Sequence, residues 1–151
     1  MEHVLLKVAA LNQFYSTRVY DTYSVAEHIL SLGFDQRIAE ADISLVADLT
    51  PVKSGGKTRR LYSFASKYCS LHAPERFPIY DSFVEKMLVH FKGTGKFSVF
   101  KTAELKNYKF FVERLAEFKT AFKLEMFTMR QLDAYLWLAG RTHFSPWPLP
   151  P

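Results

Sequence analysis

The chain has 151 residues, of which 48% are hydrophobic and 16% aromatic, and it carries a formal net charge of +5. These totals suit one domain with a buried core and exclude an intrinsically disordered protein. The single cysteine, Cys69, excludes an intramolecular disulfide and any all-cysteine metal or iron–sulfur site. Because neither a secretory signal nor an apolar run long enough to cross a membrane is visible, we expect a cytoplasmic protein with no membrane partner.

Apolar residues at helical spacing predict about seven amphipathic helices along the chain. They are expected over residues 5–15, 22–33, 35–50, 58–73, 81–95, 104–122 and 128–140. The residues expected to open or cap these helices include Thr22 or Ser24, Asp35, Thr58 and Asp81. Gly55 and Gly56 predict a turn before the fourth helix.

No segment shows sustained two-residue alternation, and only residues 97–100 suggest a short extended piece. The chain also lacks an internal repeat and a linker that would divide it. The sequence therefore predicts an all-α fold, a compact single-domain bundle of about seven helices over residues 1–144. A Pro-rich tail that cannot be helical follows over residues 145–151.

Three kinds of chemistry are disfavoured by the residues present. Gly56-Lys57-Thr58 looks like the end of a phosphate-binding P-loop, but Pro51 stands where the first glycine is needed. The histidines lack metal-ligand spacing, and His72 three residues after Cys69 is typical of core packing rather than of a catalytic pair. No nucleophile elbow is present. We therefore expect neither a metal nor a cofactor.

Basic residues surround the two consecutive glycines, and no acidic residue lies within residues 53–60. The residues predicted to contact DNA are Lys53, Ser54, Gly55, Gly56, Lys57, Thr58 and Arg59. Glycine lets a backbone approach a phosphate closely, the following helix N-terminus would face the same anion, and the basic side chains add attraction. Alternatively, the charges solvate a helix surface and the glycines only end a helix.

Asp81, in the segment Phe77-Pro-Ile-Tyr-Asp-Ser, is the candidate centre of any chemistry. Pro78 and Tyr80 are expected to fix the start of the next helix and so to place the carboxylate there. An aspartate before an amphipathic run is also an ordinary N-cap, and the two roles can coexist.

The order of these elements resembles the helix-hairpin-helix superfamily of DNA glycosylases, and within it the 8-oxoguanine-glycosylase-like bacterial branch. In that family a hairpin of the type L-P-G-x-G-x-x-T-A precedes a helix and a segment of the type P-V-D-T-H-V, whose aspartate is catalytic. Residues 77–84 keep the proline, the aspartate, a hydroxyl residue and the valine, with the proline one residue further from the aspartate. Residues 55–58 offer glycines and a threonine without the G-x-G spacing.

The resemblance implies a helix-hairpin-helix motif and a DNA glycosylase that works on double-stranded DNA, in repair or antiviral defence. The enzyme would flip a modified base out of the stack, and Asp81 would stabilise positive charge on the sugar while water attacks. An oxidised purine or a phage-type modified base is the implied target. We expect a monomer.

Two lysines are candidates for the amine nucleophile that some family members use to cleave the strand. Lys57 lies at the hairpin–helix junction, where the family's lysine usually stands, and Lys67 projects from the apolar helix before Asp81. Lys57 can instead contact a phosphate, and Lys67 can be a structural or Asp81-paired side chain. We favour a monofunctional reaction that uses water, with Asp81 and Lys67 as the candidate catalytic residues.

Aromatic residues near these positions are candidates for a base pocket, although aromatic residues at helical spacing are usually core. The candidates are Tyr15, Tyr68, Tyr80 and Trp137. Two further hypotheses compete with a glycosylase. One is a non-catalytic helix-hairpin-helix DNA-binding module, and the other is a helical protein-interaction domain.

Overall fold

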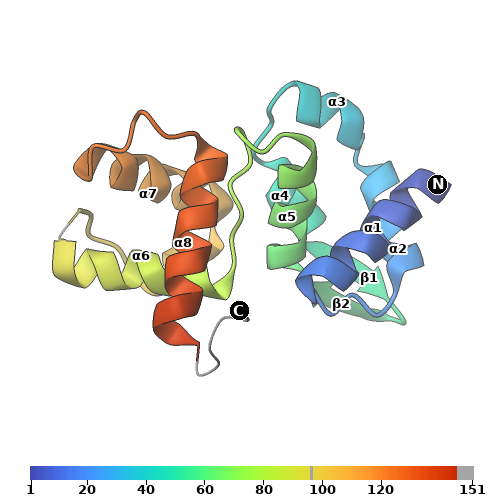
Figure 1. The fold of residues 1–151 in the computed structure, drawn as a ribbon. Coiled ribbons are helices and arrows are strands. Elements are labelled where there is room, and N and C mark those ends of the chain that lie inside the picture. The colour runs from blue at the N-terminus through green and yellow to red at the C-terminus, as the bar shows by residue number, and fades with distance from the viewer. Residues whose placement is uncertain (96, 146–151) are drawn as a thin grey trace. The chain divides into compact units, whose positions relative to one another are not determined.

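The computed structural model describes residues 1–95 and 97–145. The chain divides into two compact units, Met1–Phe77 and Pro78–Pro151, which are the N-terminal unit and the C-terminal unit. The described residues form eight α-helices, one 3₁₀ helix and one two-stranded sheet (Figure 1). The predicted predominance of helix is therefore confirmed. The predicted domain over residues 1–144 spans both units, and the Pro-rich tail lies outside the described residues beyond Ser145.

In the N-terminal unit, four helices and a β-hairpin surround one buried helix. Its elements are α1 (Glu2–Tyr15), α2 (Thr22–Ser31), α3 (Phe34–Ala39), α4 (Leu45–Leu49), β1 (Pro51–Ser54), β2 (Lys57–Arg60) and α5 (Tyr62–His72). Residues 64–70 of α5 are all buried, and this helix packs against α1 and α4. α5 is therefore the central helix of the unit.

The predicted helix over residues 35–50 is interrupted. α3 ends at Ala39 because Ala41 adopts a left-handed conformation with φ of 54°. Arg37 then pairs with Asp42 at 2.7 Å and with Asp48 at 2.6 Å, which ties the end of α3 to α4. The apolar spacing continues through this break, so the pattern of the sequence did not reveal it.

Side-chain caps decide where three other helices begin. Asp21, rather than Thr22 or Ser24, caps α2, because its carboxylate accepts the Ser24 backbone N–H at 3.0 Å. Asn107 caps α7, and it divides the predicted helix over residues 104–122 into a 3₁₀ turn and a true α-helix. Thr128 caps α8 in a capping box, at the position where the predicted helix over residues 128–140 begins.

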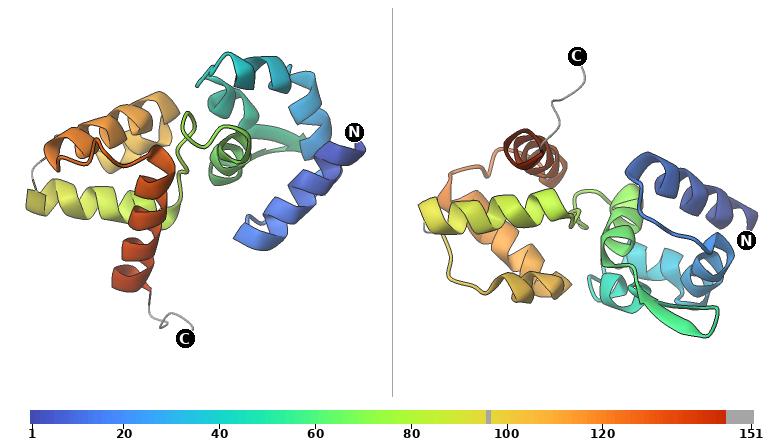
Figure 2. Two further views of the ribbon diagram at one scale, coloured as in Figure 1. Left: turned by 45° about the horizontal axis from the view of Figure 1, so that its top comes forward. Right: turned by 90° about the horizontal axis from the view of Figure 1, so that it is seen from below.

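The segment predicted to be a turn and a helix start forms a β-hairpin. β1 and β2 are antiparallel, with Val52 opposite Arg59 and Ser54 opposite Lys57. Figure 2 shows the two strands side by side between the end of α4 and the start of α5. The prediction that a helix opens at Thr58 is wrong, since that residue lies within β2.

The two glycines form the two-residue turn of this hairpin. Gly55 and Gly56 have φ values of 56° and 73°, the left-handed backbone that a tight hairpin turn requires at both central positions. Because the glycines join two strands instead of two helices, the helix-hairpin-helix motif is not confirmed. The fold is mostly helical with one small two-stranded sheet, so the predicted all-α class agrees broadly with the structure.

The C-terminal unit consists of three long helices and a short one. Its elements are α6 (Ser82–Gly95), η1 (Thr102–Lys106), α7 (Tyr108–Ala121) and α8 (Met129–Phe144). α8 crosses α6 (Figure 1), and a Cβ added at Gly140 would lie 2.8 Å from the Phe83 carbonyl oxygen. Residues 97–100 form no strand. Within the described part of the chain, no helix is long and apolar enough to cross a membrane.

Candidate functional site

The residues predicted to contact DNA lie together on the β-hairpin. All of them except Ser54 are exposed, and so is the neighbouring Arg60. The exposed predicted residues are Lys53, Gly55, Gly56, Lys57, Thr58 and Arg59. Nothing lies within 4 Å of where a Cβ would stand on either turn glycine, so the turn backbone is open to an anion. The predicted contact between a phosphate at this turn and a helix N-terminus at Thr58 is not formed, because α5 begins only at Tyr62.

Ser54 is the exception in this group, because it is half-buried and holds the hairpin in place. Its hydroxyl donates to Asp21 Oδ2 at 2.6 Å, and the same oxygen accepts the Ser24 hydroxyl at 2.7 Å. The Ser24 backbone N–H and then the Ser54 hydroxyl lower the pKa of Asp21 to about 2. The ionised Asp21 carboxylate therefore ties β1 to the N-terminus of α2.

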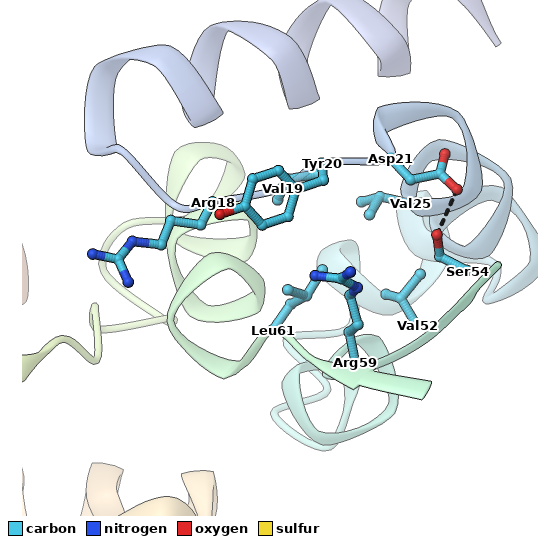
Figure 3. Close-up of a pocket in the computed structure, with 9 residues that line it drawn as sticks. All are labelled: Arg18, Val19, Tyr20, Asp21, Val25, Val52, Ser54, Arg59 and Leu61. Carbon is cyan, nitrogen blue, oxygen red and sulfur yellow. Dashed lines mark hydrogen bonds between the residues drawn. The ribbon is translucent and has the colours of Figure 1, made fainter. Parts of the chain in front are cut away.

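Beside this hydrogen-bonded link lies a cation–π pair that no local sequence pattern predicted. The guanidinium carbon of Arg59 stands 5.3 Å from the centre of the Tyr20 ring. Figure 3 shows this pair next to Arg18 and to the dashed Asp21–Ser54 bond. The cavity beneath these residues has a volume of about 10 Å³, which is room for one water molecule.

Asp81 lies in the C-terminal unit, where its carboxylate caps α6. Oδ1 accepts the backbone N–H groups of Phe83 and Val84, each at 2.9 Å. The residue is 8% exposed. The predicted position at the start of a helix is confirmed, and both hydrogen bonds use the same oxygen of the carboxylate. Oδ2 takes part in neither.

The segment that leads into Asp81 is fixed by side chains from two helices. The Tyr108 hydroxyl donates to the Pro78 carbonyl at 2.8 Å, and Asp133 Oδ2 accepts the Ile79 backbone N–H at 2.9 Å. These contacts come from α7 and α8, and they hold the backbone just before the carboxylate.

Tyr80 is a buried hub next to Asp81. Its hydroxyl donates to Glu85 and accepts from Lys106, and the Lys106 amine lies 4.5 Å from the centre of its ring. Lys106 also pairs with Glu85 at 2.9 Å. The ring packs edge-on against Phe111. Tyr80 thus fixes the start of α6, as predicted from its position before Asp81.

Lys67 is a buried lysine on α5, in the N-terminal unit. It is 7% exposed, its amine donates to the Ser63 hydroxyl at 3.0 Å, and the same amine lies 5.2 Å from the centre of the Tyr15 ring. The structure thus brings together two predicted residues, Lys67 and Tyr15. Lys67 and Asp81 belong to different units, and each is described within its own unit.

The other aromatic candidates have different surroundings. Tyr68 is 1% exposed and packs against Phe34, Phe64 and His72 in the core of the N-terminal unit. Burial raises the pKa of its hydroxyl to about 12. Trp137 is 38% exposed on α8, with the Arg141 guanidinium 5.2 Å from its ring. Tyr68 belongs to the N-terminal unit and Trp137 to the C-terminal unit, and each is described within its own unit.

The remaining candidates for chemistry are side chains that could bind a metal and the neighbouring residues Cys69 and His72. In the described part of the chain no three His, Cys, Asp or Glu side chains are grouped so as to hold a metal. Burial raises the pKa of Cys69 to about 12 and lowers that of His72. Both changes disfavour a thiolate–imidazolium pair.

A larger cavity of about 540 Å³ lies in the C-terminal unit. It is lined by Phe91, Phe118, Phe122, Leu124, Phe127, Gln131, Leu132 and Tyr135. The volume is in the range of small-molecule sites, but only Gln131 and Tyr135 offer polar atoms from their side chains.

Comparisons with known proteins place the N-terminal unit in a family. The model of an N-terminal domain, HI_0787_N, matches residues 1–76, which is almost the whole of Met1–Phe77. An uncharacterized protein of Haemophilus influenzae is 45% identical over 145 residues, which is 95% of this chain and 69% of that protein. No solved structure matches the chain.

Proposed function

The chain belongs to the HI_0787_N family, and we propose that it is a DNA glycosylase that excises a modified base from double-stranded DNA. The observation that carries the proposal is the fixed, buried carboxylate of Asp81 at the N-terminus of α6. Breaking an N-glycosidic bond builds positive charge on the sugar, and a preorganised carboxylate stabilises that charge better than one that must reorient.

The two oxygens of the Asp81 carboxylate have different roles in this mechanism. Oδ1 is held by the Phe83 and Val84 N–H groups and so sets the orientation of the group. Oδ2 takes no part in those bonds and is the oxygen we assign to the sugar cation and to the attacking water. The target base, an oxidised purine or a phage-type modified base, would leave the duplex stack before this step.

Binding to DNA is assigned to the hairpin. Four basic side chains, Lys53, Lys57, Arg59 and Arg60, are exposed there and would contact phosphates regardless of sequence. Their contribution predicts an affinity that falls steeply as salt rises.

Lys67 is the candidate amine for strand cleavage, and Lys57 is assigned to phosphate contact because it is exposed on β2. The Lys67 amine donates a hydrogen bond to the Ser63 hydroxyl and lies over the Tyr15 ring. We favour a water-using reaction. Borohydride distinguishes the lysine mechanism from the water mechanism. It reduces an amine–sugar intermediate to a covalent protein–DNA adduct, whereas an enzyme that uses water forms no such adduct.

The decisive experiment measures abasic-site formation across duplexes that carry oxidised, alkylated or phage-type modified bases. Asp81→Asn is the test variant, because asparagine caps a helix about as well as aspartate and so keeps the start of α6. We expect the variant to bind DNA like the wild type and to release no base. Base release at the wild-type rate by Asp81→Asn would contradict the proposal.

A non-catalytic DNA-binding protein is the second candidate. It is favoured by one observation, namely that capping α6 already accounts for the burial and both backbone contacts of Asp81. This candidate predicts salt-sensitive DNA binding that is lost when Lys53, Lys57, Arg59 and Arg60 are neutralised, with no abasic product from any duplex.

A further inference from the structure

The exposed ring of Tyr20 is the feature that the proposed function leaves unused. Tyr20 lies in the segment between α1 and α2 and is 77% exposed. A single exposed aromatic residue is ordinary on a protein surface, so its exposure alone carries no argument. What sets Tyr20 apart is the number of contacts that hold it and its neighbours in place.

The segment before Tyr20 is fixed to α1 by one side chain. The Asn12 amide oxygen accepts the Thr17 hydroxyl at 2.9 Å and the Val19 N–H at 3.0 Å, and its amide nitrogen donates to the Val19 carbonyl at 3.0 Å. Arg18, between these two residues, is held with φ of 58°, which is an uncommon conformation for a residue with a side chain. Such local strain is often found where a binding surface is preorganised.

The segment after Tyr20 is fixed to the hairpin. Asp21 is bonded to Ser24 and to Ser54 of β1, so the loop and the hairpin are tied together one residue from the ring. Arg59 of β2 then stands with its guanidinium 5.3 Å from the centre of that ring (Figure 3). The ring and two guanidinium groups, those of Arg59 and Arg18, are therefore presented from one rigid loop–hairpin assembly.

We infer that Tyr20 is a stacking platform for an unpaired base of a DNA strand, with Arg59 and Arg18 contacting the flanking phosphates. The inference rests on the proposed DNA-binding function and deepens it by naming the form of DNA that this surface takes. An aromatic ring stacks on any base because every base has a flat π-face, and arginine adds charge along the backbone.

The chemistry of the surface favours an unpaired base over an intact duplex. Inside a duplex each base is stacked on its neighbours, and its face is not available to a protein ring. Phosphate contacts alone would need only the hairpin lysines and arginines, and a fixed, exposed tyrosine would add nothing to them. An unpaired base, in contrast, offers a face to Tyr20 and phosphates to Arg18 and Arg59.

The test compares two labelled strands of equal length and charge, one of thymidines and one in which every base is missing. Fluorescence anisotropy gives the affinity of the full chain and of its variants for each strand. The wild type is expected to bind the thymidine strand more tightly than the abasic strand. Tyr20→Ala should lose roughly ten-fold on the thymidine strand and little on the abasic strand, because only the stacking contribution disappears.

Two matched variants complete the test. Tyr20→Phe keeps the ring and should restore the wild-type preference for thymidine. Tyr135→Ala removes a tyrosine that is 52% exposed in the other unit, and should change neither affinity. Because Tyr20 and Tyr135 are both exposed, all of these variants should unfold at the wild-type temperature.

Equal losses on both strands, or no loss on either, would overturn the inference. Binding to duplex and abasic DNA through phosphate contacts alone would still be compatible with the proposed DNA glycosylase. Conversely, a Tyr20-dependent preference for bases without base release from any modified duplex supports the stacking platform and contradicts the glycosylase.

Discussion

The hydroxyl of Ser54 donates to the Asp21 carboxylate at 2.6 Å, although the two residues are 33 positions apart in the sequence. This bond joins the hairpin to the N-terminus of helix α2, and an ionised carboxylate accepts it more strongly than a protonated one. Protons should therefore weaken the link between the two elements.

The pH dependence of stability follows from the lowered pKa of Asp21. The hydrogen bonds from Ser24 and Ser54 lower that pKa to about 2 from 3.8, so the folded state binds the proton more weakly than the unfolded state. The stabilisation is fully present above pH 3.8 and is lost as the pH falls towards 2. Asp21→Asn keeps the cap and removes the charge. Its melting temperature should lie below that of the wild type at pH 6, and the gap should close on acidification. Parallel curves from pH 6 to pH 2 would contradict this.

Removing the cap of α6 should destabilise the chain. Asp81→Ala leaves the Phe83 and Val84 N–H groups without their acceptor, which should lower the free energy of unfolding by about 0.5–2 kcal/mol. Asp81→Asn should cost much less, since asparagine accepts the same bonds. Urea unfolding of the three proteins measures both differences. An equal loss in both variants would show that the charge, rather than the cap, stabilises this position.

The hairpin turn should not tolerate side chains. Gly56→Ala places a Cβ at φ of 73°, and although nothing lies within 4 Å, the backbone conformation itself should cost about 1–2 kcal/mol. Gly93→Ala is the matched control, since Gly93 lies within α6, has no positive φ and also has open space. Alanine there should stabilise the chain by about 0.5–1 kcal/mol. The two substitutions therefore predict shifts of opposite sign in thermal unfolding.

The crossing of α6 and α8 makes a second glycine indispensable for a different reason. A Cβ at Gly140 would stand 2.8 Å from the Phe83 carbonyl oxygen, which is backbone and cannot rotate away. Gly140→Ala should therefore force the helices apart and destabilise the chain by about 1–3 kcal/mol, despite alanine's better helix propensity. Urea unfolding beside Gly93→Ala checks the prediction. A stabilised Gly140→Ala protein would mean that the helices pack less closely than the structure shows.

The thiol of Cys69 should be inert in the folded chain. It is buried, and burial raises its pKa to about 12, so very little thiolate exists at neutral pH. A thiol reagent such as iodoacetamide should label the native chain much more slowly than the chain in urea. Rapid labelling under native conditions would show that α5 opens locally.

Helix content and most helix positions could be predicted from the sequence, because apolar spacing and N-terminal caps are local signals. The helix that begins after Asp81, the helix that begins near Thr128 and the helix end near Gly33 are each found where they were expected. The breaks at Ala41 and Asn107 were not predicted. Apolar spacing runs across both, and the contacts that stabilise the breaks involve residues outside the repeating pattern.

The hairpin was missed for a related reason. β2 is exposed at all four positions, so its sequence has no alternation of apolar and polar residues to signal a strand. The glycine pair was a turn signal, but its partner strands become visible only through their pairing. The Tyr20–Arg59 contact depends on that pairing too, and no local pattern could have placed the two residues together.

The exposed hairpin has a further consequence for how the chain behaves at high concentration. A sheet of two strands has an unpaired backbone edge on each strand, and such edges invite pairing with another molecule. Lysine and arginine at three of the four positions of β2 place like charges where a second copy would have to dock. The basic side chains assigned to DNA phosphates thus also oppose pairing of β2 with a second copy of the chain. Neutralising all of them should make the protein prone to aggregate.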